Sequence, residues 1–343
     1  GTAQNSYAAF KTGGSGIASF EANGFNKEAL FNSTTDLHTS SPCLSNLGTN
    51  LLSLVPKDID DETRTSTPDI GADEFNVSTY DAAMQAIISP SGSSFATGTP
   101  YTVKVKVRNN GSTTITALNM NYSINGTVTS QAFTGLNIAA CDTMTLTFTA
   151  TLTLTTPGSN VFKIFNGLIN TTNPDLNNVK DTIILNLCTP YSGTYIINKN
   201  LPFSTTNFAS INQAVNAMYS CGVSGPVVLR IAAGSGPYNE QVTFSGVIPG
   251  SSRLATVTLS GNTTREIVNF GAGGSATQHV IRLSGAKHIK LDSLTINNPG
   301  TGYGIGVHIT AGADSNFVQN SIINIALAST SFSNSAGVSI SST

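Results

Sequence analysis

Acidic side chains gather in one short stretch of this sequence, "DIDDETRTSTPDIGADEF" at 58–75, where they could bind a metal ion. Four of them have the spacing of oxygen ligands in an EF-hand loop: Asp58, Asp60, Glu62 and Asp69. Thr63, however, stands where such a loop needs Gly, and no helical pattern flanks the stretch. The alternative is a closing turn in which Arg64 pairs with neighbouring carboxylates and Asp side chains accept turn N–H groups. The residues alone leave a Ca²⁺ site and a structural turn as the two interpretations.

Cysteines are the second group of reactive side chains, and the chain has four of them: Cys43, Cys141, Cys188 and Cys221. None belongs to a CxxC pair, and only His38 lies near any of them in the sequence, so no zinc site is predicted. Structural disulfides are the better interpretation. They indicate an oxidising compartment and therefore an extracellular or cell-surface protein.

Composition narrows the function classes further. Only 10% of the 343 residues are charged, the net charge is −2, and Trp is absent. This balance provides no basic surface for nucleic acid. No stretch approaches the length of apolar sequence that a membrane span needs. Apolar residues recur at strand-like spacing among Ser, Thr, Asn and Gly, which predicts an all-β chain.

Residues 77–188 carry the pattern of an antiparallel β-sandwich. "YTVKVKVRN" at 101–109 alternates, with Val103, Val105 and Val107 on one face. "MTLTFTATLTLT" at 144–155 alternates again, and its predicted inward residues are Leu146, Phe148, Ala150, Leu152 and Leu154. Strands of this length, separated by turns such as "NNG", predict an immunoglobulin-like sandwich.

This segment resembles the CARDB (cell-adhesion-related) domain of bacterial surface proteins. The similarity rests on "YTVKVKVRNNGSTT", the "SING" turn, "TLTFTATLT" and "NPDLNNVKD". The resemblance implies an immunoglobulin-like module that acts as a spacer or adhesive unit without catalytic residues.

Residues 189–343 begin with a predicted helix over about 209–221, followed by short strands. Ser210 is placed to cap the helix and Gly222 to end it, and one face is apolar: Ile211, Ala214, Val215, Met218 and Tyr219. A coarse repeat follows, with apolar pairs that begin at Val257, Ile281, Val307 and Val338. Imperfect periods of this length predict a solenoid of β-coils.

This region resembles the start of a right-handed parallel β-helix, whose first coil carries "G-x-Y-x-E-x-V", here within "IAAGSGPYNEQVTF". The helix is expected to cover the open end of the first coil, which would otherwise expose unpaired backbone.

The acidic stretch resembles the terminal coil of the secreted β-helix proteins of Bacteroidetes. "DLHTSSPCLSNLG" at 36–48 precedes an Asp-rich turn with Arg64 and then "DIGADEF". Asp61 departs from the Gly that is usual in that family. Residues 1–76 are therefore expected to be the C-terminal coils of one parallel β-helix. The predicted fold is right-handed parallel β-helix segments flanking an immunoglobulin-like sandwich, with one short capping helix.

This arrangement predicts a disulfide between Cys188 and Cys221, because the first ends the last sandwich strand and the second ends the capping helix. Such a bond would fix the joint between the two modules. Cys43 and Cys141 are expected to be unpaired, or paired outside this chain.

The β-helix region also contains residues that could act as acids and bases: His288, Asp292, His308 and Asp314. They show none of the paired motifs of β-helical pectin lyases, methylesterases or polygalacturonases. We therefore predict no catalytic residue, and no cofactor other than the Ca²⁺ ion considered above.

Three Asp-Ser/Thr-apolar tripeptides resemble the O-glycosylation motif that Bacteroidetes use on exported proteins. Their acceptor residues are Thr143, Thr182 and Ser293.

The expected function is a non-catalytic structural or adhesive segment of a large secreted or surface-attached bacterial protein: an adhesin, a stalk or an extracellular filament. Its expected partners are neighbouring copies or other parts of the same long chain, and glycans or other cells, with no nucleic acid and no membrane span. Type IX export is what the family resemblance implies. The alternative is the non-catalytic part of a carbohydrate-active enzyme or carbohydrate-binding protein. We also expect the parent polypeptide to continue in both directions, or copies to complete each other's helices in a homo-oligomer.

Overall fold

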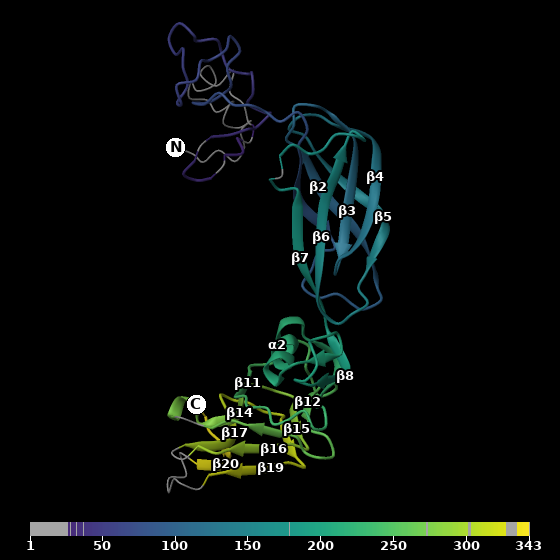
Figure 1. Cartoon of the computed structure of the whole chain (residues 1–343), viewed down its shortest axis with the longest axis vertical. Coiled ribbons are helices and arrows are strands. Elements are labelled where there is room, and N and C mark those ends of the chain that lie inside the picture. Colours follow the sequence, from purple (N-terminus) through teal and green to yellow (C-terminus); the bar gives the residue numbers. More distant parts are fainter. Residues whose placement is uncertain are drawn as a thin grey trace, which may run out of the picture.

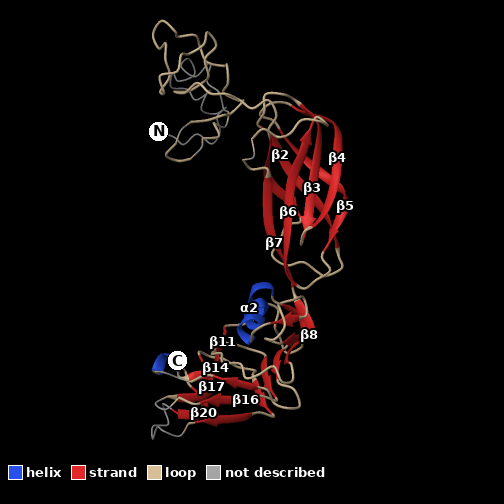
Figure 2. Cartoon of the chain, in the orientation of Figure 1, coloured by secondary structure: helices blue, strands red, loops and turns tan. Residues whose placement is uncertain are grey.

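The structure is a computed structural model, and it describes residues 27–342 apart from 28, 32, 37, 178, 272–273, 301–302 and 327–334. Three parts follow one another along the long axis of the molecule: an irregular N-terminal segment, a tall sandwich and a stack of short strands (Figure 1). Strand dominates the last two parts, and helix is confined to short pieces (Figure 2).

The sandwich consists of two antiparallel sheets. Their strands are β1 (Ala82–Ser89), β2 (Pro100–Asn109), β3 (Ile115–Ile124), β4 (Thr127–Ile138), β5 (Thr143–Thr153), β6 (Gly158–Ile169) and β7 (Thr182–Thr189). One sheet has the order β1-β2-β5 and the other the order β4-β3-β6-β7. Val103, Val105 and Val107 are fully buried between the sheets, as their alternation predicts.

The predicted inner face of the 144–155 segment is wrong at one residue, Ala150. Ala150 is exposed, while Leu146, Phe148 and Leu152 on the same strand, and Leu154 just after it, are buried. The pairing of β5 with β2 shifts register between Thr102 and Lys104. Three residues of β5, at 148–150, lie there opposite the single Val103. Ala150 therefore falls within a bulge, and the in-out alternation resumes in phase at Leu152.

The C-terminal part is a parallel β-solenoid. Its elements are β8 (Tyr191–Ile197), β9 (Asn207–Phe208), α2 (Ile211–Cys221), β10 (Val223–Ile231), β11 (Val242–Ser245), β12 (Val257–Ser260), β13 (Ile267–Asn269), η2 (Ser275–Thr277), β14 (His279–Ser284), β15 (Ile289–Asp292), β16 (Thr295–Asn298), β17 (Gly304–Thr310), β18 (Phe317–Gln319), β19 (Ile322–Ile325) and β20 (Ser335–Ile340). They form three parallel sheets, with the orders β18-β15-β12-β10-β8-β9, β11-β14-β17-β20 and β13-β16-β19. From β12 onward, each turn of chain adds one strand to each sheet in the same order.

The register of these sheets explains the sequence repeat. Ile281, Val307 and Val338 lie side by side on successive turns, as the spacing of the apolar pairs suggested. Val257 belongs to a different sheet, where it pairs with Val227 and Ile289. The predicted repeat therefore combined strands from two different sheets of the solenoid. It did so because each turn carries more than one strand with the same apolar pattern.

The helix α2 begins and ends where the sequence predicts. Ser210 Oγ accepts a hydrogen bond from the N–H of Gln213 at 3.0 Å, and the N–H of Gly222 donates to Met218 O at 2.8 Å. Glu240, the acidic residue of the first coil, accepts hydrogen bonds from the N–H groups of Ile211 and Asn212 at 3.0 and 2.9 Å. A carboxylate at a helix N-terminus is stabilised by the helix dipole, so Glu240 anchors the helix to the solenoid.

The described part of residues 27–80 differs from the expectation of parallel coils. It consists of turns and bends with one antiparallel bridge, between Lys57 and Thr63, and none of the named strands lies in it. Residues 1–26 of the predicted coils lie outside the described residues. The all-β architecture, with one short α-helix, an antiparallel sandwich and a parallel solenoid, is confirmed.

Candidate functional site: the joints between the modules

A disulfide joins the sandwich to the solenoid. Cys188, near the end of β7, is bonded to Cys221, the last residue of α2, with 4.9 Å between their Cα atoms. Cα atoms at this distance suit a disulfide without backbone movement. The bond is the one that the sequence predicts, and it fixes the helix against the last sandwich strand.

Close packing reinforces this joint. Gly158, the first residue of β6, has a φ of +95°, and a Cβ there would lie 2.3 Å from the hydroxyl oxygen of Tyr191. Tyr191 in turn contacts Tyr195 edge to face, with 5.2 Å between ring centroids, and lies beside Phe208. The N–H of Tyr191 donates to Gly222 O at 2.9 Å. Glycine is therefore required at position 158 both for its conformation and for the approach of the tyrosine ring.

A second disulfide, which the sequence did not predict, joins the N-terminal segment to the sandwich. Cys43 is bonded to Cys141, 98 residues away, with 5.6 Å between Cα atoms. Cys141 lies in the turn between β4 and β5 with a φ of +73°, and its N–H donates to Asn109 O at 2.8 Å. The expectation that these cysteines are unpaired, or paired outside the chain, is therefore wrong. A bond between residues so far apart in sequence leaves no local signal.

The acidic stretch forms a turn in which backbone groups use two of the predicted ligands. Asp58 Oδ1 accepts the N–H groups of Asp60 and Glu62 at 2.9 and 2.8 Å, and its Oδ2 accepts that of Glu74 at 3.0 Å. The bond from Glu74 is the main cause of a lowered pKa at Asp58. The buried Asp69 accepts the N–H of Phe75 through Oδ2 at 2.8 Å.

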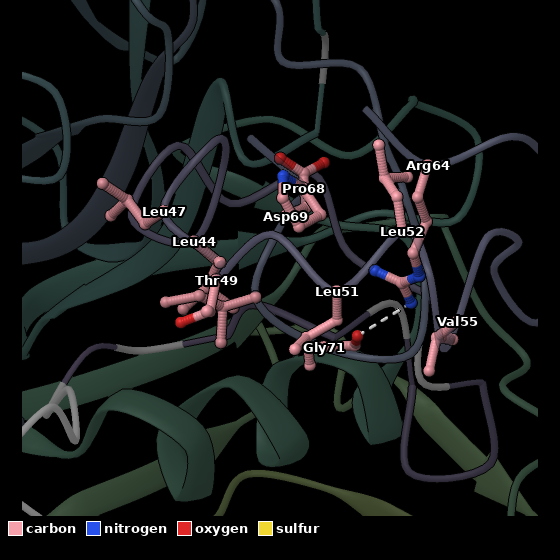
Figure 3. Close-up of a pocket in the computed structure, with 12 residues that line it drawn as sticks. Leu44, Leu47, Thr49, Leu51, Leu52, Val55, Arg64, Pro68, Asp69 and Gly71 are labelled. Atoms are coloured by element: carbon pink, nitrogen blue, oxygen red, sulfur yellow. Dashed lines mark hydrogen bonds between the residues drawn. The ribbon is translucent and has the colours of Figure 1, made fainter. Parts of the chain in front are cut away.

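Arg64 closes this turn. Its Nη1 lies 2.9 Å from Glu74 Oε1, and both side chains are about nine-tenths buried, at 10% and 12% exposure. Its Nη2 donates to Gly71 O at 3.0 Å and to Ala72 O at 2.8 Å. Figure 3 shows Arg64 and Gly71 on the wall of a hollow of about 830 Å³, whose other lining residues are largely apolar. The geometry therefore favours the second interpretation of the sequence, a closing turn held by arginine.

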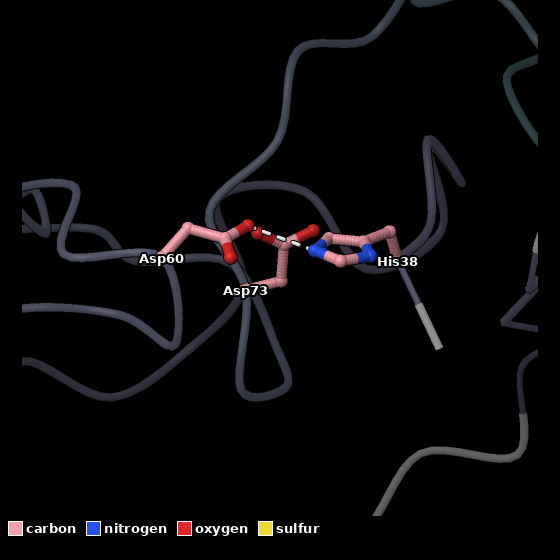
Figure 4. Close-up of side chains that lie close together, drawn as sticks. All are labelled: His38, Asp60 and Asp73. Carbon is pink, nitrogen blue, oxygen red and sulfur yellow. Dashed lines mark hydrogen bonds and ion pairs between the residues drawn. The ribbon is translucent and has the colours of Figure 1, made fainter. Parts of the chain in front are cut away.

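Of the four residues predicted to bind Ca²⁺, only Asp60 belongs to a cluster of three or more ligating groups among the described residues. That cluster contains His38 and Asp73, not Asp58, Glu62 or Asp69 (Figure 4). His38 bonds to Asp36 through Nδ1 and lies 2.8 Å from Asp60 Oδ2 through Nε2. The hydrogen bonds to Asp36 and then Asp60 raise the pKa of His38 to about 9. A protonated His38 thus serves as the counter-ion of this cluster.

Two of the possible acids and bases of the solenoid, Asp292 and His308, lie apart. Asp292 is on β15 and His308 on β17, which belong to different sheets. Asp314 forms an ion pair with Lys287 at 2.7 Å, and Asp292 accepts a hydrogen bond from Asn320 at 3.0 Å. The hydrogen bond from Lys287 is the main cause of a lowered pKa at Asp314, and His288 lies close enough to contribute to it.

The predicted O-glycosylation acceptors differ in accessibility. Thr143 and Thr182 are exposed at the starts of β5 and β7. Ser293 is half-buried, and its hydroxyl donates to Asp292 at 3.1 Å. Attachment of sugar stays a prediction, which the intact mass of the native protein would test.

Comparison with known proteins gives similarities of fold over part of the chain. No family model matches the sequence, and no curated protein matches significantly. One solved neighbour is a CARDB domain. It comes from a Pyrococcus furiosus protein, was crystallised in complex with di-metal ions, and is 17% identical over 34% of this chain and 94% of its own, with a TM-score of 0.27.

Two other solved structures match less of their own length. A sporulation control protein of Bacillus subtilis is 11% identical, covers 34% of this chain and 51% of its own, and has a TM-score of 0.21. A beta-glucosidase of Listeria innocua is 13% identical, covers 40% of this chain and 19% of its own, and has a TM-score of 0.22. No function transfers from similarities this low.

The two disulfides suggest an oxidising, extracellular environment, since such bonds are rare where thiols are kept reduced. Among the described residues, no helix has the length and apolar character needed to cross a membrane.

Proposed function

We propose that this chain is a structural segment of a large secreted or surface-attached bacterial protein of the Bacteroidetes adhesin type, where it provides reach and contact rather than catalysis. The observation that carries the proposal is the covalent cross-link at each joint. Cys43–Cys141 ties the N-terminal segment to the sandwich, and Cys188–Cys221 ties the sandwich to the solenoid. A protein that must transmit position or force along its length needs joints that do not open.

The solenoid supplies a stiff element for such a segment. Successive strands pair in parallel through backbone hydrogen bonds, so each turn adds about 4.8 Å of length along the axis. Asn269, Asn297 and Asn324 stand in register on one sheet. The Asn324 amide donates to Asn297 Oδ1 at 2.9 Å, in the manner of a side-chain ladder. Side-chain and backbone ladders together oppose bending between turns.

The sandwich suits the role of a spacer between two elements. The 77–81 connection enters at one end of the sandwich, and β8 leaves at the other (Figure 1). The cross-links at these two ends let the sandwich hold its neighbours at a fixed separation. Its broad outer faces are then available for lateral contact with glycans or with other copies.

Adhesion and turnover assays on the same chain test the proposal. Beads coated with the 343-residue protein are expected to bind cells or immobilised glycans, and the soluble protein is expected to leave polysaccharides intact. Release of new reducing ends from a polysaccharide by the purified chain would contradict the proposal. That result would favour the alternative of a carbohydrate-active enzyme. A chain with both cross-links removed is the control for whether adhesion depends on the joints.

A further inference from the structure

Three carboxylates from separate parts of the sequence meet at one end of the sandwich. Asp81 directly precedes β1, Asp181 directly precedes β7, and Asp175 lies in the connection between β6 and β7. Each offers an oxygen within 4.8 Å of the others. Asn166 of β6 holds the cluster together, because its amide donates to Asp175 Oδ2 at 2.7 Å and to Ala82 O at 3.0 Å.

Two oxygens of this cluster are buried and have no hydrogen-bond partner among the residues that the structure describes. Asp81 is only 2% exposed, and while its Oδ2 accepts from the Asn177 amide at 2.8 Å, its Oδ1 accepts nothing. Asp181 Oδ1 is buried and unpartnered in the same way. A buried acceptor without a partner costs about 1–3 kcal/mol, and more when it is charged, so native proteins rarely leave one empty. Two such oxygens beside a third carboxylate indicate a missing electropositive partner.

The described residues supply no positively charged partner to this cluster. Within the described part of the chain, none of the three carboxylates forms an ion pair. Their partners are neutral: the Asn166 and Asn177 amides and the N–H of Ala82, which donates to Asp175 at 2.8 Å. Burial first, and the neighbouring carboxylates next, raise the pKa of Asp181 to about 7. Burial likewise raises the pKa of Asp81 to about 6.

We propose that Asp81, Asp175 and Asp181 bind one Ca²⁺ ion. The donor set consists of oxygen atoms, which hard cations prefer. Asn110 donates its N–H to Asp81 O at 2.9 Å, and its own Oδ1 is also buried without a partner, so the same turn offers a further neutral oxygen. Ca²⁺ accepts six to eight oxygens in irregular geometry, whereas Mg²⁺ demands an octahedron and retains water. A buried site built from protein oxygens therefore favours Ca²⁺ over Mg²⁺.

Binding would brace the end of the sandwich that faces the N-terminal segment. The ion would hold the start of β1 and the start of β7 against the β6–β7 connection. This site differs from the acidic turn at 58–75, where Asp58 and Asp69 are occupied by backbone N–H groups.

Thermal unfolding of the full chain with Ca²⁺ or with EDTA tests the site. Ca²⁺ at millimolar concentration is expected to raise the melting temperature of the sandwich by several degrees, because an ion that binds only the native state stabilises it by mass action. Asp181→Asn should abolish this shift. In EDTA the same variant should melt at or above the temperature of the parent, because it removes a buried and repelled carboxylate. A variant that loses the Ca²⁺ shift but keeps or raises the melting temperature in EDTA has lost a ligand. A variant with a damaged fold would instead melt at a lower temperature in EDTA.

Terbium luminescence gives a second readout, since Tb³⁺ replaces Ca²⁺ at oxygen sites and Tyr80 directly precedes Asp81 as a sensitiser. Asp181→Asn should reduce the tyrosine-sensitised emission at least tenfold. Asp142→Asn, which changes an exposed carboxylate, should leave both emission and thermal shift unchanged. The proposal is overturned if Ca²⁺ produces no shift, if Asp181→Asn retains it, or if Asp60→Asn removes the signal instead.

Discussion

Replacing both Cys188 and Cys221 by Ser removes the cross-link between the sandwich and the solenoid, and its effect can be worked out from the structure. The bond closes a loop between residues 33 positions apart. In the chain-entropy account, a loop of this length contributes about 3–4 kcal/mol by restricting the unfolded chain. Because the loop contains β8, β9 and α2, the loss should fall on the helical cap of the solenoid. The remaining contacts of Tyr191 with Gly158 and Gly222 should keep the cap in place under native conditions.

Hydrogen exchange measured by mass spectrometry resolves this local effect. Amides of α2 in the Cys188→Ser/Cys221→Ser chain should exchange about a hundred- to a thousandfold faster than in the parent. This factor is the loss of about 3–4 kcal/mol expressed as a change in the equilibrium constant for local opening. The matched control is Cys43→Ser/Cys141→Ser, which removes a cross-link at the other end of the sandwich and should leave α2 protected. If the opening free energy of the α2 amides changed by less than about 1 kcal/mol, the view that this bond secures the joint would be refuted.

The remaining predictions concern the other contacts described above. Gly158→Ala should lower the free energy of unfolding by more than about 1 kcal/mol in denaturant titration, since it adds a clash to an unfavourable φ. Gly98→Ala, where φ is +77° and no atom lies within 4 Å, should show only the conformational part of that loss. Arg64→Ala should cost about 3 kcal/mol in the local stability of the 58–75 turn, because it leaves a nearly buried carboxylate without its partner, and hydrogen exchange at Ile59 and Glu62 reports it. NMR titration should give His38 a midpoint near pH 9 and His279, whose pKa burial lowers, a midpoint near pH 4. The contribution of His38 to stability should be complete below its unfolded pKa of about 6.5 and disappear as the pH rises through about 9, whereas that of a neutral His279 should be lost as the pH falls from about 6.5 toward 4.

Much of the fold is predictable because its signals are local. Alternation places Val103, Val105 and Val107 in the sandwich core, and Ser210 and Gly222 mark the ends of the helix. These features depend only on the period of a strand or on the capping of a helix, both of which a few consecutive residues determine.

The features that escaped prediction depend on distant parts of the chain. Cys43 meets Cys141 only because the N-terminal segment folds back on the β4–β5 turn. Asp81 meets Asp181 only because β1 and β7 begin at the same end of the sandwich. The EF-hand spacing at 58–69 shows the limit of a local pattern: the structure shows Asp58 accepting N–H groups of its own turn, and Ca²⁺ binding by these four residues stays a prediction.

Small-angle X-ray scattering of the oxidised full chain tests the central claim most directly, namely that the modules form one stiff, cross-linked segment. The account predicts a single elongated particle whose maximum dimension matches the end-to-end arrangement of Figure 1 and does not change with salt. The chain without cysteines should instead give a broader distribution of dimensions. A compact particle, or an oxidised chain as variable in length as the cysteine-free one, would contradict the account.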